Sequence, residues 1–330
     1  MFRKVNFKLA IPVTIFVLAG LAVAKEVYKI PNPLLVFIGG MFVVVSIIFW
    51  SLQREEKASV FVQLATWLLS CSLLTVSALG AVYYFDKAGW MWFKLTGYNV
   101  TLAENLLDRV NVSTADFVAR YPFFTIDSPD STRLLIKTGQ YKINETIIVP
   151  PALSLTIAPG AVFQFDVGCS MISYSPIIAA GTEESPIIFT AQNHWRKWGA
   201  IGVVRAGYSV FEYVRFEHGR QALVNDINFL GALALIEAEA EVRRCEFLNL
   251  YGKDGANANG GRVVFQNNIF RNCFKDGVDF DGGSGEISRN QFFDCGDEAI
   301  DRGEDSHVQI FDNSIIGSKD APKDAGAKVF

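Results

Sequence analysis

The sequence predicts membrane α-helices followed by an all-β solenoid, and two observations carry this prediction. Apolar residues make up 50% of the 330 residues, and their excess lies in the first 85, where long runs carry no charge. From residue 133 the pattern changes to short β-rich segments broken by glycine, asparagine, aspartate and proline, and these segments repeat. We therefore expect a membrane anchor at 1–86, a helical linker at 87–132 and a β-domain at 133–330.

Three apolar runs form the expected anchor: Leu9–Ala24, Ile30–Leu52 and Ala58–Phe85. A bilayer core needs about 20 apolar residues per helix. The second and third runs exceed that length without a single charge, so both are predicted to span the lipid bilayer. The first run is shorter and ends on the small-x-small sequence Ala22-Val23-Ala24, so it is either a cleaved signal peptide or a retained helix.

Both interpretations of the first run place the β-domain outside the cytoplasm. A retained first helix gives three spans that begin inside, and a cleaved one leaves two spans that begin outside. The basic residues agree with this topology, because most of them lie on the proposed inner side. The inner ones are Arg3, Lys4, Lys8, Arg54 and Lys57, against Lys25 and Lys29 in the first outer loop. No ionisable residue lies within the runs, which favours an anchor over a transporter.

The linker is expected to contain a short amphipathic helix within Thr101–Tyr121. Thr101 and Glu104 match a capping box ahead of apolar positions. Aromatic residues at its end are expected to cover the apolar end of the domain that follows. They are Phe117, Tyr121, Phe123 and Phe124.

The second half of the β-domain repeats itself with a period of roughly 22 residues, a length typical of one coil of a parallel β-helix. The apolar anchors Phe247, Phe270, Phe292 and Ile315 follow one another at this interval, and Phe216 precedes Phe247 by a longer one. Asparagine stands two positions before three of the anchors, at Asn268, Asn290 and Asn313. Coils of such a helix stack at about 4.8 Å, so equivalent residues should form columns. The last repeat is shorter than one coil, so the solenoid is expected to be incomplete at its C-terminal end.

Three segments, 155–165, 180–190 and 198–201, resemble the opening coils of bacterial right-handed parallel β-helix repeat proteins of the pectate-lyase-like group. The resemblance covers residues 133–330 and implies a right-handed solenoid. It leaves function open, because the group includes polysaccharide lyases, epimerases, glycoside hydrolases and surface proteins without a known activity. The anchor lies outside the resemblance.

The candidate site is an acidic ladder near the C-terminal end. Residues 262–330 contain thirteen acidic residues and eight basic ones. Asp279 and Asp301 lie one repeat apart, so they should stack, and one of two adjacent carboxylates should then hold a proton or share a cation. Such a pair can act as acid and base on a sugar, hold Ca²⁺, or serve as a turn ladder that needs no ligand. The candidate ligand or cation-binding residues are Asp276, Asp279, Asp281, Asp297 and Asp301.

A second candidate feature is the aromatic pair Trp195 and Trp198, which is expected either to stack on sugar rings or to form part of a loop cluster. The sequence therefore leaves three functions open, of which the third is a purely structural membrane subunit and the other two involve a ligand. One is an extracytoplasmic scaffold that binds a polysaccharide or a cell-envelope protein, and the other is a polysaccharide-modifying enzyme that uses the aspartate ladder. Without a basic cluster, and with a net charge of −4, nucleic acid is not an expected partner.

Overall fold

The computed structural model describes residues 103–126, 132–193, 196–318 and 328–329, all within the compact unit Phe85–Phe330. The three apolar runs predicted to span the membrane lie outside the described residues. Among the helices that are described, none has the length and apolar character needed to cross a bilayer.

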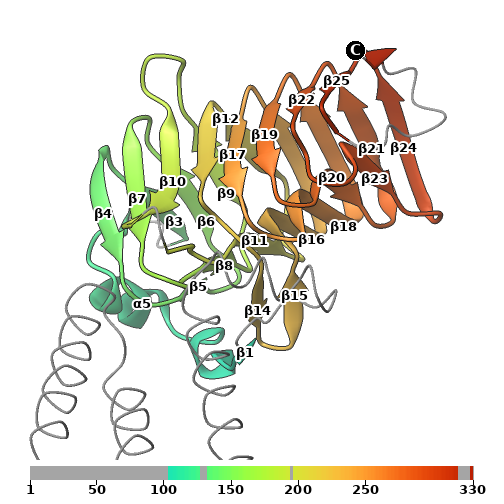
Figure 1. Cartoon of the computed structure of the whole chain (residues 1–330). Coiled ribbons are helices and arrows are strands. Elements are labelled where there is room, and N and C mark those ends of the chain that lie inside the picture. The colour runs from blue at the N-terminus through green and yellow to red at the C-terminus, as the bar shows by residue number, and fades with distance from the viewer. Residues whose placement is uncertain (1–102, 127–131, 194–195, 319–327, 330) are drawn as a thin grey trace, which may run out of the picture. The chain divides into compact units, whose positions relative to one another are not determined.

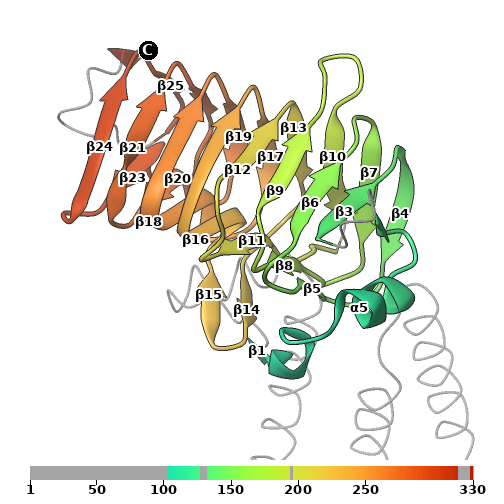
Figure 2. The same ribbon diagram turned by 180° about the vertical axis from the view of Figure 1, so that it is seen from behind.

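The described chain winds through about eight coils, and their strands line up in three walls of parallel strands (Figure 1). Wall A contains β3 (Arg133–Ile136), β6 (Ser154–Ile157), β9 (Ile177–Ala180), β12 (Ser209–Glu212), the second halves of β16 (Gly231–Arg243) and β18 (Asp254–Gln266), β21 (Gly283–Ser288) and β24 (Ser306–Phe311). Figure 2 shows the same coils from behind.

Wall B follows wall A in each coil and is a single nine-stranded sheet. It contains β4 (Gly139–Ile143), β7 (Ala161–Phe165), β10 (Ile187–Ala191), β13 (Val214–Glu217), β17 (Glu246–Leu250), β19 (Ile269–Cys273), β22 (Gln291–Phe293), β25 (Ser314–Ile316) and β26 (Lys328–Val329). Wall C then closes the coil. It contains β5 (Ile147–Val149), β8 (Met171–Ser173), β11 (Ile201–Val204), the first halves of β16 and β18, β20 (Asp276–Phe280) and β23 (Ile300–Arg302).

Inside wall B, seven aromatic rings form one continuous stack. Neighbouring ring centroids lie 4.4 to 5.4 Å apart, close to the strand spacing that separates coils. The stack runs through Tyr141, Phe163, Phe189, Phe216, Phe247, Phe270 and Phe292. Ile315 pairs with Phe292 in the next coil. The register predicted from the apolar anchors is therefore confirmed.

The corner between walls A and B carries the predicted asparagine column, which is also confirmed. Each carboxamide is buried and bonds its neighbour along the stack: Asn290 Oδ1 accepts from the backbone N–H and the Nδ2 of Asn268, both at 2.9 Å. Asn313 Oδ1 accepts from Asn290 in the same way, at 2.9 and 3.0 Å. Because each amide also donates to a backbone carbonyl, buried polar groups of the corner are satisfied.

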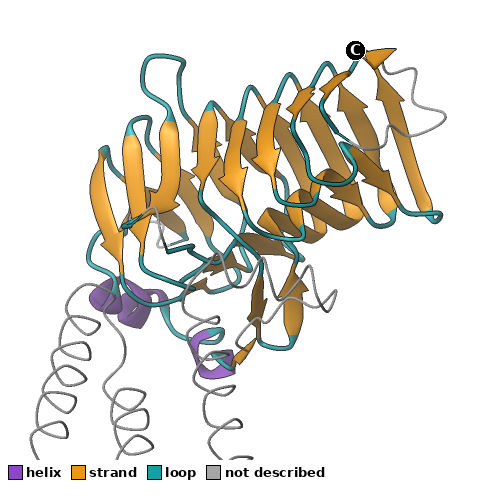
Figure 3. Cartoon of the chain, in the orientation of Figure 1, coloured by secondary structure: helices purple, strands orange, loops and turns teal. Residues whose placement is uncertain are grey.

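The linker contains a short helix within the predicted range, but this helix begins later than the capping box at Thr101 and Glu104 indicated. The α-helix α5 (Thr114–Arg120) begins after Ser113, whose Oγ accepts from the backbone N–H of Asp116. Residues 103–104 instead form strand β1, because they pair with a distant strand of the solenoid, and Leu107–Arg109 form a short 3-10 helix. Figure 3 shows that the described helices are confined to this linker. Tertiary pairing has overridden the local capping signal.

The linker aromatics cover the first coil, as predicted. Phe117 and Phe124 are fully buried, and Tyr121 is nearly so. Phe123 stacks against Tyr141, the first ring of the column, with centroids 5.2 Å apart. The strand β2 (Thr125–Ile126) then pairs with β3 as the chain enters the solenoid. The expected incomplete C-terminal end falls largely outside the described residues. Residues 328–329 are described there, and as strand β26 they pair with β25.

A hairpin covers the first part of wall C from outside. Its strands, β14 (Ala222–Val224) and β15 (Ile227–Phe229), form a small three-stranded sheet with β1. The ring of Phe229 lies against Gly202, where an added Cβ would come within 2.5 Å of it. Asn225 at the hairpin turn accepts from Leu106 N and donates its own N–H to Glu104 O, so hairpin and linker hold each other.

Candidate functional site

The predicted aspartate ladder exists and lies on wall C beyond the hairpin. Asp279 of β20 pairs with Asp301 of β23, as the repeat spacing indicated, and Asp254 pairs with Asp276. We call the following set the acidic cluster: Asp254, Asp276, Asp279, Asp281, Glu298 and Asp301, with the counter-ions Lys253 and Lys275. The cluster thus extends over three consecutive coils.

The outward column of wall C changes character where the cluster begins. In the coils under the hairpin it holds Ile172, Gly202 and Ala234, which pack in a small apolar core with Phe229 or lie against its ring. In the next three coils the same column holds Asn257, Asp279 and Asp301. A wall that had only to pack would not need this change, because buried carboxylates cost free energy.

The tripeptide Lys-Asp-Gly positions the charged groups, and it occurs twice at the start of wall C, at 253–255 and 275–277. Glycine is required because the coils approach closely there. A Cβ on Gly255 would lie 2.6 Å from the Gly277 carbonyl oxygen, and one on Gly277 would lie 2.5 Å from that of Ala299. The lysine and aspartate that precede the glycine in one tripeptide are therefore placed one coil away from those of the other tripeptide.

The two lysines are the functional residues that sequence reasoning missed. Lys253 Nζ lies 3.1 Å from Asp279 Oδ2, and Lys275 Nζ lies 2.8 Å from Asp276 Oδ2 and 3.8 Å from Asp297 Oδ2. Burial alone would lower the pKa of Lys253, but the charges of Asp254, Asp279 and Asp281 outweigh it and raise that pKa above its ordinary value. Lys253 is therefore an ammonium counter-ion rather than a base. The repeated Lys-Asp-Gly sequence was the signal that could have identified both residues.

Asp254 is the most perturbed group of the cluster. Its side chain is 1% exposed, and within the described residues neither of its carboxyl oxygens has a hydrogen-bond partner. Burial, together with the charge of Asp279, raises its pKa to about 9, so Asp254 is protonated at neutral pH. Burial raises the pKa of Asp279 to about 6, partly offset by Lys253. Two neighbouring carboxyl groups thus hold different protonation states at pH 7.

The remaining carboxyl groups range from fully buried to partly exposed. Asp276 is fully buried, accepts from the backbone N–H of Glu298 at 3.0 Å, and has a pKa raised by burial. Burial and the charge of Asp301 raise the pKa of Glu298 to about 6. Asp281, Glu298 and Asp301 are partly exposed and form the rim of the cluster, and the partly exposed Asp297 lies beside it.

The donor set does not fit the calcium ion that the sequence suggested. Ca²⁺ takes six to eight oxygen ligands. Among the described residues, however, no three histidine, cysteine or acidic side chains are placed to hold a metal. The positive charge beside the buried carboxylates of Asp279 and Asp276 comes instead from Lys253 and Lys275, respectively.

The predicted sugar-stacking role of Trp198 is wrong. Its ring is fully buried, stacks on Phe165 with centroids 4.9 Å apart, and its Nε1 donates to Glu217 O at 2.7 Å. The apolar ring completes the core at a wide turn between walls B and C, so no face is left for a ligand. Trp195 lies outside the described residues.

Comparison with known proteins agrees with this geometry. Residues 181–329 match the family model described as right handed beta helix region. No curated protein and no solved structure matches the chain. The fold is therefore a right-handed β-solenoid, a class that serves both scaffolds and enzymes.

Proposed function

We propose that this chain is a membrane-anchored, extracytoplasmic scaffold of the pectate-lyase-like type, and that its solenoid binds a glycan at the rim of the acidic cluster. The observation that carries the proposal is the change in the outward column of wall C from Ala234 to Asn257, Asp279 and Asp301. The rim supplies partly exposed acceptors from two consecutive coils, Asp281 on one and Glu298 and Asp301 on the next. Glycan hydroxyl groups donate to carboxylates, and a repeating polymer can meet repeating acceptors on a solenoid face.

Glycan binding is tested with the full-length protein on an array of neutral and acidic oligosaccharides. We expect retention of at least one glycan class, and a loss of affinity of at least tenfold in the double variant Asp281→Asn, Asp301→Asn. The matched control, Glu184→Gln with Glu239→Gln, removes two exposed carboxylates elsewhere and should bind like the native protein. Equal binding by both double variants would refute the proposed site.

A second candidate function, glycan modification, is favoured by one observation. Asp254 holds a proton while the neighbouring Asp279 is largely ionised at neutral pH, and carboxyl groups with pKa values pushed apart are the usual acid–base arrangement of glycan-active sites. Product analysis of the retained glycans separates the two functions. A scaffold returns them unchanged, whereas an enzyme shortens, unsaturates or epimerises them and loses this turnover in Asp279→Asn.

The extracytoplasmic location is tested separately by protease access. A recognition sequence for a site-specific protease, inserted between Glu183 and Glu184 at an exposed loop, should be cut in intact spheroplasts of a bacterial host. We expect this result because both interpretations of the first apolar run place the β-domain outside the cytoplasm. Protection of the inserted site until the cells are lysed would place the domain in the cytoplasm.

A further inference from the structure

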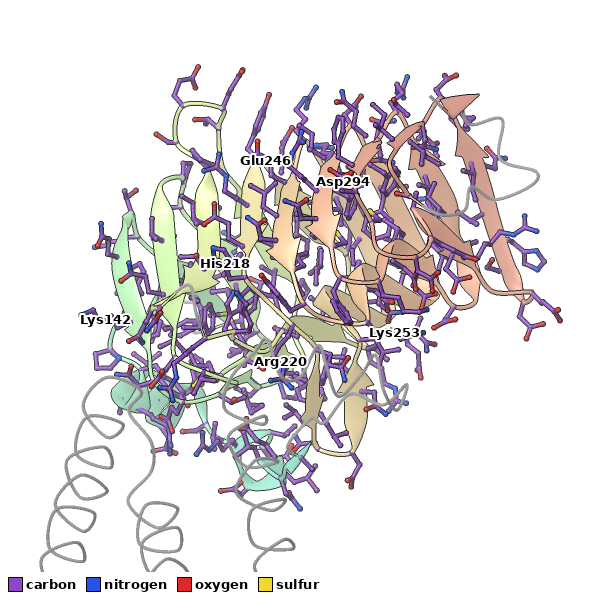
Figure 4. The ribbon with its side chains drawn as sticks, in the orientation of Figure 1. Lys142, His218, Arg220, Glu246, Lys253 and Asp294 are labelled. Atoms are coloured by element: carbon purple, nitrogen blue, oxygen red, sulfur yellow. The ribbon has the colours of Figure 1, made fainter. Side chains whose placement is uncertain are left out.

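A pocket of about 290 Å³ lies on the outer face of the solenoid, at the corner between walls A and B. Its lining residues come from four consecutive coils and include Glu183, Tyr213, Arg215, Arg244, Glu246 and Asn267. Glu246 on wall B and Lys253 beside wall C lie on different sides of the solenoid (Figure 4). The pocket is therefore separate from the acidic cluster.

The pocket exists because one corner is longer than those that follow. Strands β9 and β10 are joined by residues 181–186, and this loop stands above the neighbouring turns (Figure 1). It is fixed in place, because Gly181 N donates to Glu212 O at 2.8 Å and Ser185 O accepts from Gly160 N at 3.0 Å. The loop overhangs the short corners of the next coils, and the step between them forms the pocket.

The residues beneath the overhang adopt a backbone conformation that their side chains do not favour. Tyr213, Arg244 and Asn267 have φ values of 48°, 52° and 56°, and the same column continues at Arg289 and Asp312. This left-handed region suits glycine and asparagine, and it costs other residues about 1 kcal/mol. Asparagine at this corner, as at Asn267, fits the left-handed backbone, so Tyr213 and Arg244 stand beside the pocket at a conformational cost that asparagine would avoid.

The polar groups of the pocket define the ligand class. Arg215 Nε pairs with Glu246, and Arg244 Nη1 pairs with Glu212 at 2.6 Å, which leaves other guanidinium N–H groups for a ligand. Glu183 and Glu246 balance the two arginines, so an anion gains little there. Adjacent donors and acceptors suit vicinal hydroxyl groups. The guanidinium of Arg244 lies over the ring of Tyr213, with its Cζ 5.7 Å from the ring centroid, so the two side chains line the pocket together.

We propose that this pocket binds a single neutral monosaccharide unit. Its volume is close to the lower limit of about 300 Å³ for small-molecule sites, which is enough for one pyranose ring. The pocket would be a second carbohydrate site, because it lies at the corner between walls A and B and the acidic cluster lies on wall C. This proposal does not depend on glycan binding by the acidic cluster.

Saturation-transfer NMR on the full-length protein tests the proposal. The probes are methyl β-D-glucopyranoside, methyl β-D-galactopyranoside, methyl α-D-mannopyranoside and galacturonate. We expect at least one neutral glycoside to bind, and its Kd to rise at least fivefold in Tyr213→Asn with Arg244→Asn. Asparagine suits the left-handed backbone, so this variant should keep the native melting temperature within a few degrees.

Two controls make the result specific. Arg289→Asn makes the same change in the same backbone conformation outside the pocket and should leave the Kd unchanged. Asp281→Asn with Asp301→Asn, which tests the wall C site, should also leave it unchanged, so failure of one site is distinguished from failure of the other. Binding of galacturonate alone, no binding of any probe, or full binding by the Tyr213 and Arg244 double variant would each overturn the proposal.

Discussion

Replacing Phe270 with alanine should lower the free energy of unfolding by about 3–5 kcal/mol, the range for truncating a buried aromatic residue. Phe270 is fully buried, and its ring lies between Phe247 and Phe292, with centroids 4.4 and 4.9 Å away. Alanine would leave a cavity that coils fixed by backbone pairing on both sides cannot close. Chemical denaturation followed by tryptophan fluorescence measures the loss.

Phe293→Ala is the matched control, because it removes the same side chain from the outer face of the neighbouring coil. The ring of Phe293 is partly exposed and lies under the guanidinium of Arg271 at 4.1 Å. Its loss should cost about 1 kcal/mol or less. Equal destabilisation by the two substitutions would show that the ring stack is not the core of the solenoid.

The stability of the native domain should fall as the pH rises from about 4 to about 9, and Asp254 should cause most of the fall above pH 7. The pKa of Asp254 is raised to about 9, so the folded state keeps a proton that the unfolded chain has released. The folded state then binds more protons, and stability decreases with pH by up to about 1.4 kcal/mol per pH unit for one group. Asp279 and Glu298, with pKa values of about 6, contribute with the same sign at lower pH.

Asp254→Asn should flatten this dependence between pH 7 and 9 and raise the melting temperature at pH 8 by several degrees, because asparagine stays neutral in both states. Thermal melts of the two proteins at pH 5, 7, 8 and 9 make the comparison. Asp297→Asn, which removes a carboxylate that is 44% exposed, should retain the slope of the native protein. A native protein whose stability is constant from pH 7 to 9 would show that Asp254 is ionised in the folded state.

The columns of the solenoid were predictable from sequence because a coil of nearly constant length repeats its chemistry at a constant spacing. The offset of Asn268, Asn290 and Asn313 from their anchors therefore located both the corner and the ring stack. Pairing between distant segments leaves no such signal, and strand β1 was missed because its partner, Leu223, lies several coils further along the chain. Trp198 was misjudged for a related reason. Its neighbours His194, Arg196 and Lys197 are polar, and only the fold shows that its ring completes the core.

The pairing of the aspartates in the acidic ladder was predicted from the sequence, but the lysines that neutralise them and the protonation of Asp254 were not. Equal spacing placed Asp279 on Asp301, whereas the separation of Lys253 from Asp279 is longer than one repeat, so no regular interval in the sequence connects the two. Protonation of Asp254 depends on burial, which a pattern of residue types does not measure.

The corner between walls A and B also restricts how this gene can change its length. If the coil that begins with β3 is counted as coil 1, that corner holds only two residues from coil 5 onward. The second of the two belongs to the column of Cys245, Asn268, Asn290 and Asn313. One codon added there would move every later ring and carboxamide out of register. The corner between walls B and C is different: coil 4 carries a whole hairpin there, yet Phe216 and Phe247 still stack at 4.8 Å. Over evolutionary time, small insertions should accumulate at that second corner and in the loop 181–186, while the solenoid itself grows or shrinks by whole coils.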